Sequence, residues 1–142
     1  MATILVVDSR PEEAQNVRVR LTREGHEVLS AAEGPSGLLA AFTQRPDLVI
    51  LDAQTPGTDG FATLRCMLRE MKNDARTTHV PVVLLVAEAD LPAVRETPDG
   101  GSPDVSDYVL KPFDIEEVAS CVGKVLTDRG AAYPAAIWPL FG

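Results

Sequence analysis

Cysteine and positive charge are both scarce in this chain of 142 residues. Its two cysteines, Cys66 and Cys121, lie far apart without CxxC spacing, and with only two scattered histidines they form no recognisable zinc site. Lys and Arg number 13 against 21 Asp and Glu, and the net charge of −8 argues against a nucleic-acid-binding surface. No apolar run approaches the ~20 residues of a membrane span, and the N-terminus lacks the pattern of a signal peptide. We therefore expect a cytoplasmic protein that binds neither nucleic acid nor membrane.

Short apolar runs alternate with helical patterns along most of the chain. The ordinary balance of 45% apolar and 24% charged residues indicates a globular domain. Strands are expected at Thr3–Val7, Glu27–Ala31, Leu48–Asp52, Pro81–Ala87 and Ser106–Leu110. Helices are expected between Ser9 and Gly25, at Ser36–Gln44 and Phe61–Lys72, for a turn or two at Leu91–Glu96, and at Asp114–Leu126. Five strands alternating with helices predict an α/β fold: a flavodoxin-like, doubly wound parallel sheet in the order 2-1-3-4-5.

Two segments depart from this regular pattern. Asp90–Pro103 holds three prolines and two adjacent glycines, so the fourth helix is expected to be stunted and followed by a loop. The domain is expected to span residues 1–127 and to be followed by an apolar, Pro-containing tail at 128–142. Three hypotheses remain open for the tail: it folds back onto the helices, it joins two copies into a homodimer, or it begins a second domain.

Three polar residues stand at strand ends: Asp8, Asp52 and Lys111. The carboxyl ends of parallel strands meet at one edge of the sheet, where such folds hold their ligand sites. Two carboxylates suit Mg²⁺, which prefers oxygen ligands, and a lysine suits a phosphoryl oxygen. The sequence thus predicts phosphoryl chemistry with Asp52 as the nucleophile, Mg²⁺ spreading the charge and Lys111 opposite.

The segments ILVVDS, DLVILDAQTPGTDGF, PVVLLVA and DYVLKPFD, in this order, resemble the receiver domain of two-component response regulators over residues 2–127. The resemblance implies that Asp52 accepts a phosphoryl group from a histidine kinase or a phosphotransfer protein. It implies that Asp8, Asp52 and the backbone carbonyl of Gln54 bind Mg²⁺, and that Lys111 contacts the phosphoryl group.

The same resemblance assigns a cis peptide to Lys111-Pro112 and an aromatic switch position to Tyr108.

Two residues depart from the family pattern. Ser9 stands where receivers usually carry a second acid, which is expected to weaken Mg²⁺ binding unless Ser9 only caps the first helix. Val86 replaces a Thr or Ser hydroxyl that binds the phosphoryl group, which predicts an impaired switch and leaves Tyr108 open to a purely structural role as a partly buried strand residue.

Two functions therefore remain open. The first is an atypical receiver, phosphorylated on Asp52, that passes a signal to a downstream protein. The alternative is a phosphorylation-independent pseudo-receiver that acts through protein contacts. An enzyme is not expected, since an aspartyl-nucleophile phosphatase would need an acid at Gln54 and no other catalytic motif is present.

Overall fold

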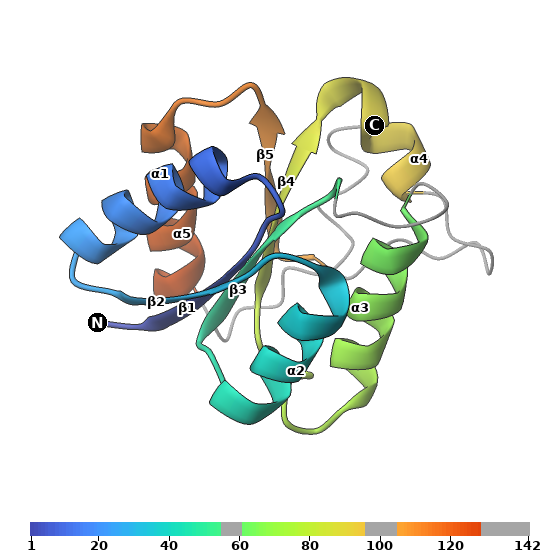
Figure 1. The fold of residues 1–142 in the computed structure, drawn as a ribbon. Helices are drawn as coiled ribbons and strands as arrows, with labels where there is room; N and C mark the ends of the chain where they lie inside the picture. Colours follow the sequence, from blue (N-terminus) through green and yellow to red (C-terminus); the bar gives the residue numbers. More distant parts are fainter. Residues whose placement is uncertain (55–60, 96–104, 129–142) are drawn as a thin grey trace.

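The computed structural model describes residues 1–54, 61–95 and 105–128 (Figure 1). Strands and helices alternate throughout this part of the chain. The strands are β1 (Thr3–Val7), β2 (Glu27–Ala31), β3 (Leu48–Asp52), β4 (Val82–Ala87) and β5 (Asp107–Lys111). The helices are α1 (Pro11–Arg23), α2 (Gly34–Gln44), α3 (Ala62–Asn73), α4 (Leu91–Arg95) and α5 (Ile115–Thr127), with a 3-10 turn, η1, at Glu88–Asp90.

The five strands form one parallel sheet in the order β2-β1-β3-β4-β5, which confirms the predicted flavodoxin-like topology. All five residues of the central strand β3 are buried, as expected for a strand covered on both faces. In register, Val7 of β1 pairs with Leu51, and Asp52 pairs with Leu85 of β4. The ends of β1 and β3 therefore lie side by side at the carboxyl edge of the sheet.

Helices cover both faces of this sheet, as Figure 1 shows. Helices α1 and α5 lie on one face and enclose a core that includes Ile4, Ile50 and Val118. Helices α2, α3 and α4 lie on the other face around a second core that includes Leu51 and Leu64. Cys66 and Cys121 are both free and belong to helices on opposite faces of the sheet.

Most helix ends agree with the sequence patterns to within one or two residues. Helix α2 begins at Gly34 rather than at Ser36, because Pro35 occupies its first turn, where proline needs no hydrogen bond. Helix α5 begins one residue after Asp114, whose side chain accepts a hydrogen bond from the backbone of Glu116 as the N-cap. The expected stunted fourth helix is α4, which has five residues.

Two sequence expectations fall outside the described residues: the loop after the fourth helix, at 96–104, and the tail at 129–142. Within the described ranges, no helix is long and apolar enough to cross a membrane.

Candidate functional site

Asp52 is the last residue of β3, and its side chain is completely buried. Its two oxygens differ. Oδ1 accepts hydrogen bonds from the Lys111 ammonium at 2.6 Å and from the Gln54 backbone N–H at 3.3 Å. Oδ2 is buried and receives no hydrogen bond from any described residue. Because a buried carboxylate oxygen without a partner is costly, Oδ2 is a candidate ligand-binding atom.

Lys111 ends β5 and supplies the positive charge of the site. Its ammonium lies 2.6 Å from Asp52 Oδ1 and 3.0 Å from Glu13 Oε2, and its side chain is 10% exposed. One cation is therefore shared by two carboxylates. The peptide bond that follows, between Lys111 and Pro112, is cis.

Asp8 follows β1 directly and is also buried. Its Oδ1 accepts the backbone N–H of Arg10 at 2.9 Å, which fixes the turn between β1 and α1, while no donor among the described residues reaches Oδ2. Burial is the largest cause that raises the pKa of Asp8 to about 8, and the neighbouring carboxyl groups of Glu13 and Asp52 add to it. In the folded, metal-free protein, the Asp8 carboxyl group thus retains its proton near neutral pH.

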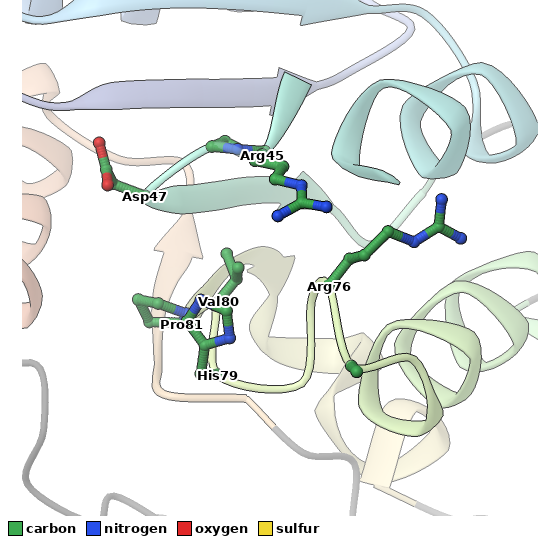
Figure 2. A pocket seen from close by; sticks show the side chains of 8 residues that line it. Arg45, Asp47, Arg76, His79, Val80 and Pro81 are labelled. Carbon is green, nitrogen blue, oxygen red and sulfur yellow. The ribbon is translucent and has the colours of Figure 1, made fainter. Parts of the chain in front are cut away.

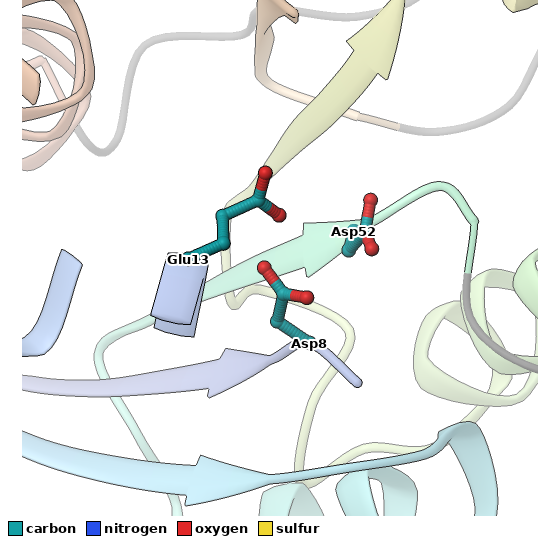
Figure 3. Close-up of side chains that lie close together, drawn as sticks. All are labelled: Asp8, Glu13 and Asp52. Carbon is teal, nitrogen blue, oxygen red and sulfur yellow. The ribbon is translucent and has the colours of Figure 1, made fainter. Parts of the chain in front are cut away.

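Glu13 is the site residue that the sequence pattern did not reveal. It lies in the first turn of α1, and its side chain turns inward toward Asp8 and Asp52 (Figure 3). One carboxylate oxygen from each of these three residues lies within 4.8 Å of the others. Burial works to raise the pKa of Glu13, but its contacts with the Asp8 carboxyl and the Lys111 ammonium outweigh burial and lower this pKa below its ordinary value. Glu13 is therefore the ionised member of the Asp8–Glu13 pair.

A chain of exposed polar contacts runs beside this cluster. The Arg10 guanidinium donates to Gln54 Oε1, and Gln54 Nε2 donates to Asp90 Oδ2 at 2.9 Å. The three residues come from the segments that follow β1, β3 and β4. The Gln54 side chain thus ties together three loops at the sheet edge that carries the carboxylates.

The structure shows the surroundings of Ser9 and Val86, the two residues that depart from the family pattern. Arg10, not Ser9, is the N-cap residue of α1, so the reading in which Ser9 caps this helix is wrong. Val86 is 1% exposed within the apolar core under α2 to α4, and half-buried Tyr108 packs against the same core. No hydroxyl stands at the end of β4 to reach a ligand on Asp52, since Ala87 is its last residue.

A hollow lies at the opposite edge of the sheet from the carboxylates, beside the residues that precede β3 and β4 (Figure 2). Two of its charged residues, Asp47 and Arg76, already have structural partners. Asp47 accepts the backbone N–H of Thr3 at 2.8 Å, and Arg76 pairs with Asp74 at 2.8 Å while lying over the Phe42 ring. The residues with predicted chemistry all lie at the carboxyl edge instead, and the structure brings Asp8, Asp52 and Lys111 together there.

Comparison with known proteins identifies the family. The family model described as the response regulator receiver domain matches residues 4–122. Protein PilH of Pseudomonas aeruginosa is 33% identical over 128 residues, which cover 89% of this chain and 98% of PilH. The DNA-binding dual master transcriptional regulator RpaA of Synechocystis sp. is 34% identical over 131 residues, covering 91% of this chain but 52% of RpaA.

Solved structures agree with the sequence matches. The receiver domain of the sensor histidine kinase PA1611 from Pseudomonas aeruginosa, solved with a magnesium ion coordinated in its active site cleft, is 25% identical. It superposes with a TM-score of 0.72 and covers 89% of this chain and 98% of its own. The chain thus spans nearly the whole length of some relatives and about half or less of others. By sequence and by fold, it belongs to the response regulator receiver domain family of two-component signalling.

Proposed function

We propose that this receiver domain accepts a phosphoryl group on Asp52 and that Mg²⁺ assists the transfer. The observation that carries the proposal is the state of the Asp52 carboxylate. It is fully buried, one oxygen is held by Lys111, and the other oxygen has no partner among the described residues. A side chain held in this way is costly for the fold and is suited to a reaction at the free oxygen.

The donor is a phosphohistidine of a histidine kinase or of a phosphotransfer protein, the partners with which receiver domains interact. Asp52 Oδ2 attacks the phosphorus, a P–O bond forms, the P–N bond breaks, and the departing imidazole nitrogen takes up a proton. Lys111 steadies the carboxylate before the reaction and faces the charge of the phosphoryl oxygens afterwards. Its ammonium is already within 2.6 Å of the acceptor, so it needs no large movement to act.

The residues present fit a magnesium ion. Asp8 and Asp52 each have a buried carboxylate oxygen without a donor, and both residues belong to a cluster of carboxyl groups, whose oxygens are the ligands that Mg²⁺ prefers. The backbone carbonyl of Gln54 is proposed as a further ligand. Mg²⁺ bound there would offset the negative charge that gathers on the phosphoryl oxygens.

The output of this receiver is expected to be muted. Val86 cannot donate the hydrogen bond that a hydroxyl would give to a phosphoryl oxygen, and such a bond to a charged group is worth ~1.5–3 kcal/mol. Shifting a two-state equilibrium from 1:99 to 99:1 in favour of the active conformation needs ~5.5 kcal/mol. The missing hydrogen bond therefore removes a quarter to a half of the free energy needed for a complete switch. The burial of Val86 in an apolar core favours the second candidate function, in which the domain binds a downstream protein without phosphorylation.

The partner of the domain is proposed to be a protein in either case. RpaA is a DNA-binding regulator, but this chain covers only 52% of it. The net charge of −8 of the present chain disfavours direct contact with DNA phosphates.

Phosphorylation is tested by incubating the protein with Mg²⁺ and a small phosphoryl donor, followed by intact mass spectrometry and peptide mapping. We expect one added phosphoryl group on the peptide that contains Asp52, and none in the Asp52→Asn variant. Beryllofluoride, a phosphoryl mimic, is expected to shift the amide resonances of residues near Asp52. No adduct in the wild type at millimolar Mg²⁺ would overturn phosphorylation and leave the pseudo-receiver function.

A further inference from the structure

The carboxylate that is absent at Ser9 has a counterpart one helical turn further along the chain. Glu13 projects from the first turn of α1 into the space beside Asp8 and Asp52 (Figure 3). A glutamate side chain is one methylene longer than an aspartate, which suits a carboxylate that reaches the site from the helix. The three carboxyl groups come within 4.8 Å of one another.

Glu13 behaves differently from the acid beside it. Glu12 is exposed in the same turn of α1, where a negative charge simply favours the positive end of the helix dipole. The Glu13 side chain is only 18% exposed and faces two other acids. The helix dipole alone does not explain an inward orientation, since an exposed carboxylate would serve it equally well.

Pairing with Lys111 does not account for the cluster either. The Lys111 ammonium already lies 2.6 Å from Asp52, and Glu13 is a second carboxylate on the same cation at 3.0 Å. The cluster thus holds three carboxyl groups and one ammonium, while the nearby Arg10 guanidinium is bonded to Gln54. Carboxyl oxygens in excess of the available cations are the ligands that a hard divalent cation such as Mg²⁺ takes.

A separate observation points to a ligand at the same place. Asp8 and Asp52 are 4% and 0% exposed, and the Oδ2 atom of each receives no hydrogen bond from the described residues. Both oxygens belong to residues of the cluster that Glu13 joins. Buried carboxylate oxygens in a folded protein normally have a hydrogen-bond donor or a metal ion as a partner.

We propose that Glu13 supplies the second metal-binding carboxylate of this receiver, so that Asp8, Glu13 and Asp52 together bind a divalent cation such as Mg²⁺ despite the serine at position 9. The assignment rests on the proposed function of the site, and it replaces the expectation that the loss of an acid at Ser9 leaves metal binding weak. Affinity for Mg²⁺ then depends on a residue of α1 as well as on Asp8 in the loop after β1.

The experiment measures Mg²⁺ binding to the intact chain by calorimetry, with Mn²⁺ and electron paramagnetic resonance as a second readout. Glu13→Gln keeps the shape of the side chain and removes its charge. We expect the dissociation constant to rise ~10–100-fold or more, the range seen even when residues that support a metal ligand are lost. Glu12→Gln, the matched control in the same helical turn, is expected to bind as the wild type does.

A rescue variant separates metal binding from the contact with Lys111. Adding Ser9→Asp to Glu13→Gln places an acid back in the loop, and this double variant is expected to recover most of the lost affinity. If Glu13 serves only to hold Lys111, Glu13→Gln will bind Mg²⁺ as tightly as the wild type, and the assignment is overturned. Absence of Mg²⁺ binding in the wild type would also overturn it.

The outcomes for Glu13 and for the proposed function are distinguishable. A wild type that binds Mg²⁺ through Glu13 but forms no Asp52 adduct supports the metal assignment and refutes phosphorylation. A wild type that forms the adduct, with Mg²⁺ affinity unchanged in Glu13→Gln, supports phosphorylation and refutes the role of Glu13.

Discussion

Replacing the ionisable carboxyl group of Asp8 with a neutral amide is expected to stabilise the metal-free protein, although the residue belongs to the proposed site. The Asp8→Asn substitution keeps the side-chain oxygen that accepts the Arg10 N–H at 2.9 Å. It removes a carboxyl group that is buried beside Glu13 and Asp52, and whose pKa is raised from 3.8 to about 8, first by burial and then by these neighbours. The fold therefore opposes ionisation of this side chain, and asparagine avoids that cost.

The magnitude follows from the difference in pKa between the folded and unfolded chains. At pH 7 the pH is about three units above the pKa of an aspartate in the unfolded chain. At about 1.4 kcal/mol per unit, keeping Asp8 protonated in the folded state costs at most about 4 kcal/mol. Glu13 offsets part of this, because its own pKa is lowered by contact with Asp8. We expect the free energy of unfolding to rise by about 1–3 kcal/mol.

The sign of the pH dependence is fixed by the direction of the shift. Between about pH 4 and pH 8 the folded state binds more protons at Asp8 than the unfolded state does, so stability falls as the pH rises through this window. The gain from Asp8→Asn should therefore be smaller at pH 5 than at pH 7. Mg²⁺ should stabilise the wild type, by ~2.7 kcal/mol at 100 times its dissociation constant, and the variant much less.

Urea unfolding followed by circular dichroism measures these differences, at pH 5 and pH 7, with and without Mg²⁺. Glu12→Gln, which removes an exposed acid, is the control and should change the free energy of unfolding little. A metal-free Asp8→Asn protein that is no more stable than the wild type at pH 7 would refute the electrostatic reasoning.

Further substitutions test the switch and the packing of the helices. Val86→Thr should cost ~1–3 kcal/mol of stability, because it buries a hydroxyl in an apolar core, and should enlarge the response of Tyr108 resonances to beryllofluoride. Gly37→Ala should cost ~1–3 kcal/mol, since a Cβ there would lie 2.7 Å from a methyl group of Val7. Gly123→Ala in α5 should instead stabilise by ~0.5–1 kcal/mol, because its Cβ would meet nothing within 4 Å.

Each of these expectations has an opposing result. Equal Tyr108 responses in the Val86→Thr variant and the wild type would show that a hydroxyl at this position does not couple to the aromatic ring. A Gly37→Ala variant with an unchanged urea midpoint would mean that α2 moves away from β1 at little cost. Loss of stability in Gly123→Ala would contradict the open surroundings of that glycine.

The fold could be predicted from the sequence because its signals are local and agree with one another. The buried run of β3, the turn formers around it and the periodicity of α5 each specify one element. The short α4 was predictable from the prolines and glycines that follow it. The start of α2 was missed by two residues, since Gly34 and Pro35 are typical of turns as well as of first helical turns.

The site was predictable only where its residues end strands. Asp8, Asp52 and Lys111 were found because parallel strands deliver their last residues to one edge. Glu13 was missed because an acid in the first turn of a helix already has an explanation in the helix dipole. Its inward direction depends on how α1 packs against the sheet, a tertiary feature that no local pattern reports.

A high-resolution crystal structure of the protein with Mg²⁺ and beryllofluoride tests the central claim most directly. We predict beryllofluoride bonded to an oxygen of Asp52, Lys111 in contact with a fluorine, and Mg²⁺ bound by carboxylate oxygens of Asp8, Glu13 and Asp52. An Asp52 carboxylate without beryllofluoride, in a crystal grown with saturating Mg²⁺ and mimic, would contradict the claim.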